Sequence, residues 1–395
     1  MSDTEAFQLV LEAARSPHQF RSGVIEFLNS RPELLQPTSP EQHEDYLGAE
    51  IARARAIQRV LYDAGWGRIG WSPEVGGVGG DPLMRSVFAE ATAEAAALTT
   101  AAKNAIAFLE ILGPAFLKSA TPDLIERFFP PFLAGDEGWC QGFSEPDAGS
   151  DLSAMRTSAT RVDDGWRLNG GKIWTSYAQY ARRCLLLART GPRESRHRGI
   201  SAFLIDMDSP GVSVSPIESM GDYDDFCQLT FEDVHIPRDR IVGIEGGGWL
   251  VTMDILAGER GAVMWQESAI LAQRFAELLH GDPTTSVGTA RLGSVFLDLY
   301  ALRAHSRRTQ AALADDVTIG PMSSFDKILD AAAHQGVLDL ARDVLQDRFA
   351  FGDAGEDGIL REDFLYSRAA TIYGGTAEIQ RNTVADRILD LPASR

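Results

Sequence analysis

The sequence predicts an α+β protein in which a helical segment, a small β-rich segment and a second helical segment follow one another. The first third of the 395 residues is rich in strong helix formers, the middle gains Gly, Ser and β-branched residues, and the last third is again dominated by helix formers. Strands and helices do not alternate, which argues against a doubly wound parallel sheet. We therefore expect three domains, covering residues 1–135, 136–240 and 241–395.

The first third carries three helix signals. Residues 49–61 are a run of strong helix formers. An Asp-Pro pair at 81–82 is typical of an N-cap and first helical position, and it predicts a helix through about residue 97. A Thr-Pro pair at 121–122 predicts another helix over 124–133.

The middle segment has the turn signals of short strands. Residues 165–174 predict a hairpin that turns near Asn169-Gly170. Four further strands are expected, and the last of them alternates polar and apolar side chains as a half-buried strand does. These strands cover residues 183–189, 201–207, 212–215 and 228–231. We expect them to form a small antiparallel sheet or barrel.

The last third predicts a helical bundle. Residues 249–279 are a long run of helix formers, which Gly258 and Gly261 interrupt at modest cost. A Gly-Asp-Pro segment at 281–283 is expected to end this helix. Further helices are predicted over residues 291–314, 324–349 and 376–389.

Composition limits the function. Hydrophobic residues make up 44% of the chain, and 37 Lys and Arg stand against 56 Asp and Glu, giving a net charge of -19. This acidic balance argues against nucleic acid or anionic lipid as a partner over a broad surface. The three cysteines have no paired spacing, and no run of about 18 uncharged apolar residues exists. We therefore expect a reducing compartment, no membrane insertion and a cytoplasmic location.

Several common catalytic signatures are absent from the sequence. The glycines at 246–248 lack the spacing of a dinucleotide fingerprint, and residues 165–172 lack the first glycine and the final Ser or Thr of a phosphate loop. The seven histidines are scattered and form no HxxxH pair, so we expect no metal. Without a GxSxG elbow, any enzyme chemistry is expected to come from an organic cofactor.

Four segments, in this order, resemble the acyl-CoA dehydrogenase family of flavoproteins. They are residues 141–151 (QGFSEPDAGSD), 172–176 (KIWTS), 258–261 (GERG) and 371–381 (TIYGGTAEIQR). The resemblance covers nearly the whole chain. It implies bound FAD, an acyl-CoA thioester as substrate, and an electron-transfer flavoprotein or similar acceptor as partner.

The resemblance assigns the first two segments to the flavin. Taken alone, serines in this loop would be ordinary turn residues, and a tryptophan after a strand would more often lie in the core. In similar proteins the position of Ser144 bonds the flavin ring edge, and that of Ser150 lies near the CoA arm. The position of Trp174 lies against the flavin, and the hydroxyl of Ser176 lies near N5. The expected cofactor-binding residues are Gln141, Phe143, Ser144, Ser150, Trp174, Thr175, Ser176, Thr376 and Glu378.

Glu259 is the expected catalytic base. A helical Glu-Arg pair is by itself most often solvated. Desaturating a thioester between Cα and Cβ, however, requires a carboxylate that removes the α-proton in a dry pocket, where desolvation raises its pKa. Most family members carry this carboxylate in a Tyr-Glu-Gly-Thr motif, where the chain has Gly374. Some relatives instead place it on the first helix after the β-domain, before an arginine, which matches Glu259 and Arg260.

Three residues are expected to contact the substrate. Ser150 and Arg260 are assigned to it by the resemblance. The amide of Gly374 is expected to polarise the thioester carbonyl, because a backbone donor needs no side chain. The glycines at 258, 261 and 374 suggest room for a bulky or branched acyl group.

A second departure from the family concerns assembly. Family members usually carry an Arg-x-x-Phe-Gly motif downstream of the helix arginine, and its arginine reaches the flavin pyrophosphate of a neighbouring subunit. Residues 281–285 of this chain read Gly-Asp-Pro-Thr-Thr, and the glycine-rich segment 351–355 is also altered. Two assemblies remain open: a homo-oligomer (dimer or tetramer) with substitute donors, and a heteromer with a homologous subunit.

The leading hypothesis is an FAD-dependent acyl-CoA dehydrogenase that uses Glu259 as its base. One alternative is a flavin oxidase or monooxygenase on the same fold. The other is a cofactor-dependent partner subunit of a heteromeric acyl-CoA dehydrogenase.

Overall fold

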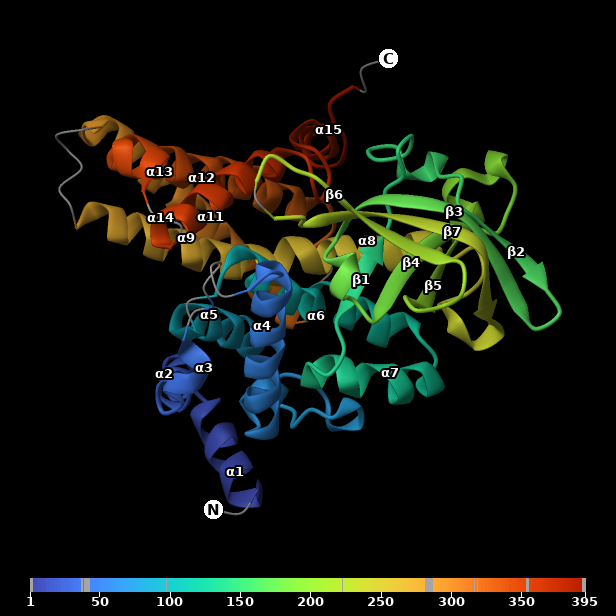
Figure 1. Cartoon of the computed structure of the whole chain (residues 1–395), viewed down its shortest axis with the longest axis horizontal. Coiled ribbons are helices and arrows are strands. Elements are labelled where there is room, and N and C mark those ends of the chain that lie inside the picture. The colour runs from blue at the N-terminus through green and yellow to red at the C-terminus, as the bar shows by residue number, and fades with distance from the viewer. Residues whose placement is uncertain are drawn as a thin grey trace. The chain divides into compact units, whose positions relative to one another are not determined.

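The computed structural model describes residues 3–36, 38, 43–96, 98–221, 223–280, 287–315, 317, 319–352 and 355–392 (Figure 1). Helices, then strands, then helices follow one another along the chain, which confirms the predicted α+β class. The chain forms two compact units, each assembled from separate stretches of sequence. The sheet unit contains residues 47–79 and 101–258, and the helical unit contains residues 1–46, 80–100 and 259–395. The division into three domains stays a prediction.

In the described part of the sheet unit, one mixed sheet has the strand order β6-β7-β3-β2-β4-β5-β8, with β1 beside β4. The strands are β1 (Trp139–Gly142), β2 (Ser158–Val162), β3 (Gly165–Ser176), β4 (Arg183–Arg189), β5 (Ile200–Asp206), β6 (Val212–Ile217), β7 (Phe226–Pro237) and β8 (Ile241–Val242). Most neighbours are antiparallel, but β4 pairs in parallel with β1 and with β2. The end strands do not meet, so the sheet predicted for this segment is not closed into a barrel.

The predicted hairpin within residues 165–174 is wrong. β3 continues through Asn169 and Gly170, pairing with β2 on one side and β7 on the other. The turn lies between β2 and β3 at residues 163–164, where two aspartates supply the turn chemistry. Gly170 instead marks an irregularity against β7, because its φ is +136° and a Cβ there would lie 2.7 Å from Thr157 Cα.

Helices accompany the sheet within its unit. They are α4 (Tyr46–Asp63), α6 (Thr100–Ser119), α7 (Pro122–Ala134) and α8 (Gly248–Gly258). Trp139 of β1 stacks on Phe132 of α7, with ring centroids 4.3 Å apart. β4 is buried along its whole length, and its successive side chains alternate between two hydrophobic clusters. Both faces of this central strand are therefore covered by hydrophobic side chains.

The helical unit has a core among three long helices that lie side by side (Figure 1). These are α9 (Met264–Leu279), α11 (Thr289–Ala314) and α12 (Ser323–Leu345), which meet through residues such as Leu271, Leu302 and Leu340. The other described α-helices of this unit are α1 (Asp3–Ala13), α2 (Pro17–Asn29), α3 (Pro32–Leu35), α5 (Leu83–Ala96), α13 (Asp347–Phe351), α14 (Glu356–Tyr366) and α15 (Ala377–Arg387).

The predicted helix caps at the two proline pairs are confirmed. Asp81 accepts a hydrogen bond from the Leu83 amide at 2.8 Å ahead of α5. Thr121 Oγ1 accepts one from the Leu124 amide at 3.4 Å at the start of α7.

The long helix predicted over residues 249–279 is not α-helical throughout. A π-helical turn, Glu259–Val263, separates α8 from α9. Such turns add a residue to the helix, re-aim the following side chains, and are frequent at functional sites. The predicted end of α9 at residues 281–283 lies outside the described residues.

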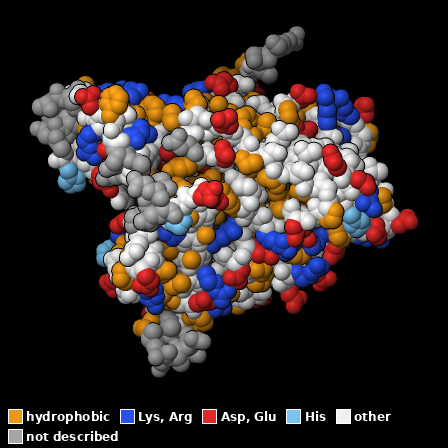
Figure 2. Space-filling view, in the orientation of Figure 1, with side chains coloured by type: hydrophobic (Ala, Val, Ile, Leu, Met, Phe, Trp, Pro, Cys, Tyr) orange, Lys and Arg blue, Asp and Glu red, His pale blue; other side chains and the backbone are white. Residues whose placement is uncertain are grey.

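Among the described helices, none is both long and apolar enough to cross a bilayer. On the face shown in Figure 2, basic and acidic side chains are interspersed.

Candidate active site

Glu259 begins the π-helical turn in the helical unit. The residue is half-buried, and burial raises the pKa of its carboxyl. Arg260 and Lys327 act against this shift, whereas Asp330 adds to it. A carboxylate with a raised pKa is matched to accepting a proton near neutral pH.

The turn before α15 brings Gly374 directly to Glu259. Gly374 has φ +63°, and a Cβ at this position would lie 2.5 Å from Glu259 Oε1. A side chain at 374 would therefore require the Glu259 carboxylate to move from this position. This contact gives a physical reason why the sequence pairs a glutamate at 259 with a glycine at 374.

Hydrogen bonds fix the same turn. The Gly374 carbonyl accepts from Arg260 Nη2 at 3.1 Å and from the buried Gln380 Nε2 at 3.0 Å. Among the described residues, the Gly374 amide has no hydrogen-bond acceptor. Arg260 thus binds the Gly374 carbonyl, and the Gly374 amide remains available to a ligand. The substrate contacts of Arg260, Gly374 and Ser150 stay predictions.

The sequence assigned no role to Lys327, Asp330 and Tyr373, which lie near Glu259 within the helical unit. Lys327 and Asp330 are buried on α12 and form an ion pair of 3.1 Å. The available signal was a Lys and an Asp three residues apart on a helix with an apolar face. That signal is common on exposed helices too, so the sequence does not distinguish this pair.

The loop after β1, in the sheet unit, is anchored to β3 by a buried ion pair. Lys172 Nζ donates to Glu145 Oε1 at 2.8 Å and to the Phe143 carbonyl at 3.0 Å, and the lysine side chain is 0% exposed. Glu145 also accepts from the amides of Arg156 and Thr157, at 2.6 and 3.0 Å. Burial raises the pKa of Glu145, but Lys172 and these amides outweigh it and lower the pKa overall.

The anchored loop should depend strongly on Lys172. We expect Lys172→Met to lower the free energy of unfolding by about 3–5 kcal/mol, because it leaves Glu145 buried without its cation. Lys118→Met makes the same change in an exposed pair with Asp254 and should cost about 1 kcal/mol or less. Urea unfolding of the two variants measures both. Equal losses would mean that the buried pair does not anchor the loop.

Trp174 lies on the surface of the sheet unit. Its side chain is 57% exposed, although tryptophan is a strongly buried residue type. Its φ of +60° is uncommon for a bulky residue and marks a constrained backbone at the end of β3. Phe226 of β7 supports the indole edge-on, with ring centroids 6.0 Å apart. An aromatic face held outward in this way is available to a flat ligand.

The remaining predicted cofactor residues differ in their surroundings. Thr175 is buried, and its Oγ1 has no hydrogen-bond partner among the described residues. Phe143 packs into the core, so its side chain is not available to a ligand. Thr376 caps α15, accepting from the Ile379 amide at 3.2 Å. The others are partly or fully exposed: Gln141, Ser144, Ser150, Ser176 and Glu378. Their roles stay predictions.

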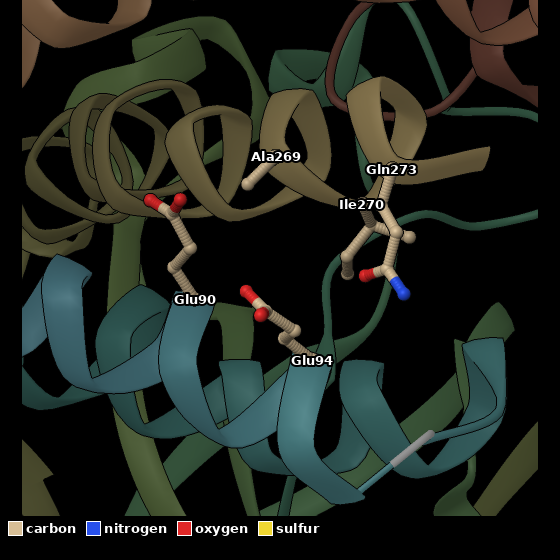
Figure 3. A pocket seen from close by; sticks show the side chains of 5 residues that line it. All are labelled: Glu90, Glu94, Ala269, Ile270 and Gln273. Atoms are coloured by element: carbon tan, nitrogen blue, oxygen red, sulfur yellow. The ribbon is translucent and has the colours of Figure 1, made fainter. Parts of the chain in front are cut away.

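A pocket of about 240 Å³ lies elsewhere in the helical unit, between α5 and α9. Figure 3 shows Glu90 and Glu94 projecting from α5 toward Ala269 and Gln273 of α9. Both carboxylates have protein partners, since Glu90 accepts from Trp265 Nε1 at 2.7 Å and Glu94 pairs with Arg21. We therefore assign this pocket no part in the chemistry. In the described part of the chain, no three His, Cys, Asp or Glu side chains form a metal-binding group.

Comparison with known proteins identifies the family to which the chain is similar. The models of the N-terminal, middle and C-terminal domains of acyl-CoA dehydrogenases match residues 18–136, 140–234 and 246–389. The acyl-CoA dehydrogenase IpdE1 of Mycobacterium tuberculosis is 35% identical over 343 residues, which cover 86% of this chain and 88% of IpdE1. The chain belongs to the acyl-CoA dehydrogenase family. Acyl-CoA dehydrogenases are flavoprotein oxidoreductases that act on the CH–CH bond of acyl-CoA, so the predicted family and enzyme class are confirmed.

Two solved structures share the fold of this chain. The Tcur3481-Tcur3483 steroid ACAD is 23% identical, has a TM-score of 0.81, and the match covers 96% of this chain and 98% of that one. A chain of the ChsE4-ChsE5 complex of Mycobacterium tuberculosis is 25% identical, with a TM-score of 0.77 and coverage of 96% and 98%.

Proposed function

We propose that the chain catalyses the FAD-dependent α,β-dehydrogenation of an acyl-CoA thioester, with Glu259 as the base that removes the α-proton. The observation that carries the proposal is the contact of Glu259 with Gly374. The carboxylate occupies the space in which a side chain at 374, the usual position of the base in the family, would begin. In this proposal the base is supplied from position 259 in place of position 374.

The surroundings of Glu259 suit this role. Burial raises its pKa, so the carboxylate is a stronger proton acceptor than an exposed one. The free amide of Gly374 is a candidate donor to the thioester carbonyl, which would stabilise the negative charge that develops there. The bound flavin supplies the hydride acceptor for the β-carbon.

The sheet unit offers the residues that would hold the flavin. An outward-facing Trp174 and a buried, unpartnered hydroxyl at Thr175 fit a cofactor that stacks on an aromatic face and bonds neighbouring donors. The loop that carries Ser144 is fixed to the same strand, because the Ser144 carbonyl accepts from the Ile173 amide at 2.9 Å. The residues present thus fit the cofactor of the family.

Trp174→Ala should weaken FAD binding. Loss of one aromatic contact corresponds to about 0.5–1.5 kcal/mol, or a rise in Kd of roughly 2- to 12-fold. Trp174→Phe keeps an aromatic face and should retain most of the affinity. Titration of FAD into the cofactor-free chain, followed by flavin fluorescence, measures both variants. An unchanged Kd for Trp174→Ala would remove Trp174 from the cofactor site.

The proposed reaction is tested by anaerobic bleaching of the flavin. Straight-chain, branched and cyclic acyl-CoA thioesters are added in turn to the FAD-loaded enzyme, and the visible flavin absorbance is followed. Bleaching by at least one thioester, with formation of the enoyl-CoA, is expected. If none of them reduces a fully loaded enzyme, the dehydrogenase proposal is wrong.

The glycines do not indicate the acyl group. A Cβ on Gly258 would lie 3.2 Å from the Glu110 carbonyl oxygen of α6, so this glycine permits close helix packing rather than space for a ligand. The space beside Gly374 is taken by Glu259. Gly258 and Gly374 therefore do not support the suggestion of a bulky acyl group. The bleaching experiment with different acyl-CoA thioesters tests which acyl class is used.

We propose further that the chain works in an oligomer, and that a homologous sister subunit supplies its missing flavin-diphosphate arginine. Two observations support the heteromer: the sequence at residues 281–285, which lie outside the described residues, and the likeness to the ChsE4-ChsE5 complex. Native mass spectrometry with FAD quantification tests it. A homo-oligomer with one FAD per chain would rule out the need for a sister subunit. An electron-transfer flavoprotein or a similar protein remains the proposed electron acceptor.

A further inference from the structure

The buried ion pair on α12 has no role in the function proposed above. Lys327 and Asp330 stand three residues apart and so share one face of the helix. Lys327 Nζ donates to Asp330 Oδ2 at 3.1 Å, and the two side chains are 2% and 0% exposed. Asp330 Oδ1 has no hydrogen-bond partner among the described residues. Since burying two charges is costly, such a pair calls for a functional explanation.

Two further contacts fix the position of the Lys327 side chain. Its Nζ lies 3.9 Å from the centroid of the Tyr373 ring, the geometry of a cation–π interaction. Burial, and then Asp330, raise the pKa of Tyr373 well above its ordinary value, so the ring stays a neutral phenol. A Cβ on Gly374 would lie 3.5 Å from Lys327 Cε and 2.5 Å from Glu259 Oε1. The lysine and the carboxylate thus flank the same glycine.

Charged groups from more than one helix lie around Glu259 and affect its ionisation. Arg260 and Lys327 favour the ionised carboxyl, and Asp330 disfavours it. Arg260 donates a hydrogen bond to the Gly374 carbonyl at 3.1 Å. The elements packed against the π-helical turn also carry Glu90 (α5), Glu267 (α9), Arg303 (α11) and His334 (α12), and Tyr373 lies in the turn before α15. Of these, Arg303 pairs with Glu90 and His334 with Glu267. Within the part of the chain that the structure describes, Lys327 is therefore the cation from another helix that acts on Glu259.

We propose that Lys327, fixed by Asp330 and Tyr373, is a positioning residue that holds Glu259 in its ionised, proton-accepting form. This inference rests on the proposed role of Glu259 as the base. A desolvated carboxylate without a fixed cation takes up a proton more readily, and the acid form cannot accept the α-proton. Asp330 holds the Lys327 side chain in place through the 3.1 Å ion pair.

The test uses two single substitutions that remove opposite charges. Lys327→Met should move the acid limb of flavin reduction to higher pH by about one unit, because the cation that favours ionised Glu259 is lost. Asp330→Asn should move the limb to lower pH, because the anion is lost and Lys327 remains. The rate of anaerobic flavin reduction, measured as a function of pH, gives the acid limb of each variant. Lys327→Arg keeps the charge and should stay closer to the unsubstituted enzyme.

A second readout does not depend on the cofactor. The carboxyl carbon of Glu259, labelled with ¹³C in the full chain and assigned by its absence from Glu259→Gln, is titrated by NMR. Its midpoint should move up in Lys327→Met and down in Asp330→Asn. The double variant Lys327→Met/Asp330→Asn, which leaves no unpaired charge, covers the case in which a single variant does not fold. The Glu259 midpoint of this double variant should lie above that of the unsubstituted chain. Burial still raises the pKa of Glu259, and Lys327 no longer lowers it.

Asp326→Asn is the matched control for a purely structural effect. Asp326 is buried one turn earlier on α12 and pairs with His305 at 2.9 Å. It should lower stability and leave the Glu259 midpoint unchanged. Midpoints that stay fixed in the Lys327 and Asp330 variants, or move in the same direction, would overturn the inference. If Glu259→Gln still reduces flavin at the normal rate, the proposed function fails instead, so the two failures are distinguishable.

Discussion

Glu259→Gln is expected to reduce the rate of flavin reduction by about 100-fold or more, which is typical for loss of a positioned general base. The amide keeps the size of the side chain beside Gly374 and cannot accept a proton. Binding of the acyl-CoA should therefore survive. Anaerobic stopped-flow reduction of the FAD-loaded enzyme, together with a separate measurement of thioester affinity, separates the two effects.

The control for this variant is Glu277→Gln, the same chemical change on the exposed side of α9. It should reduce flavin at the normal rate. If the Glu259 variant does so as well, the base lies elsewhere and the mechanism is wrong.

The pH dependence of the unsubstituted enzyme follows from the same residue. Burial raises the pKa of Glu259, so the carboxyl holds its proton to higher pH than an exposed glutamate does. The rate of flavin reduction should therefore increase with pH through a midpoint above the ordinary range of glutamate, and Glu259→Gln should lack this limb.

Gly374→Ala is expected to lower the rate of flavin reduction by roughly 10- to 100-fold. Its Cβ would lie 2.5 Å from Glu259 Oε1, so the carboxylate has to move away from its position. A displacement of about 1 Å at a reacting group can cost 100-fold in rate. The rate measured at saturating thioester shows the effect on the chemical step.

Backbone strain alone would also affect this variant, because Gly374 has φ +63°. Gly320→Ala separates the two causes. Gly320 has φ +53°, and a Cβ there would meet nothing within 4 Å. Both variants should lose similar stability, and only Gly374→Ala should lose activity. A fully active Gly374→Ala would show that the close contact with Glu259 does not position the base.

Local patterns in the sequence were sufficient for most of the secondary structure. The caps at Asp81 and Thr121 depend on residues next to them in the chain, and the structure contains both. The hairpin at Asn169-Gly170 was predicted wrongly because its turn chemistry is also local, whereas the continuation of β3 depends on pairing with β7. Long-range pairing can override a turn signal, and the sequence of one strand does not reveal it.

For the candidate site, the sequence by itself determined the family motifs, the absence of a carboxylate at position 374 and its presence at position 259. It could not show that these two positions touch, because they are more than a hundred residues apart and meet only when the turn before α15 packs on the π-helical turn. The exposure of Trp174 and the burial of Lys327 were likewise decided by the tertiary structure. The physical reason is that burial and contact, which set the pKa of a carboxyl and the availability of an aromatic face, are properties of neighbours distant in sequence.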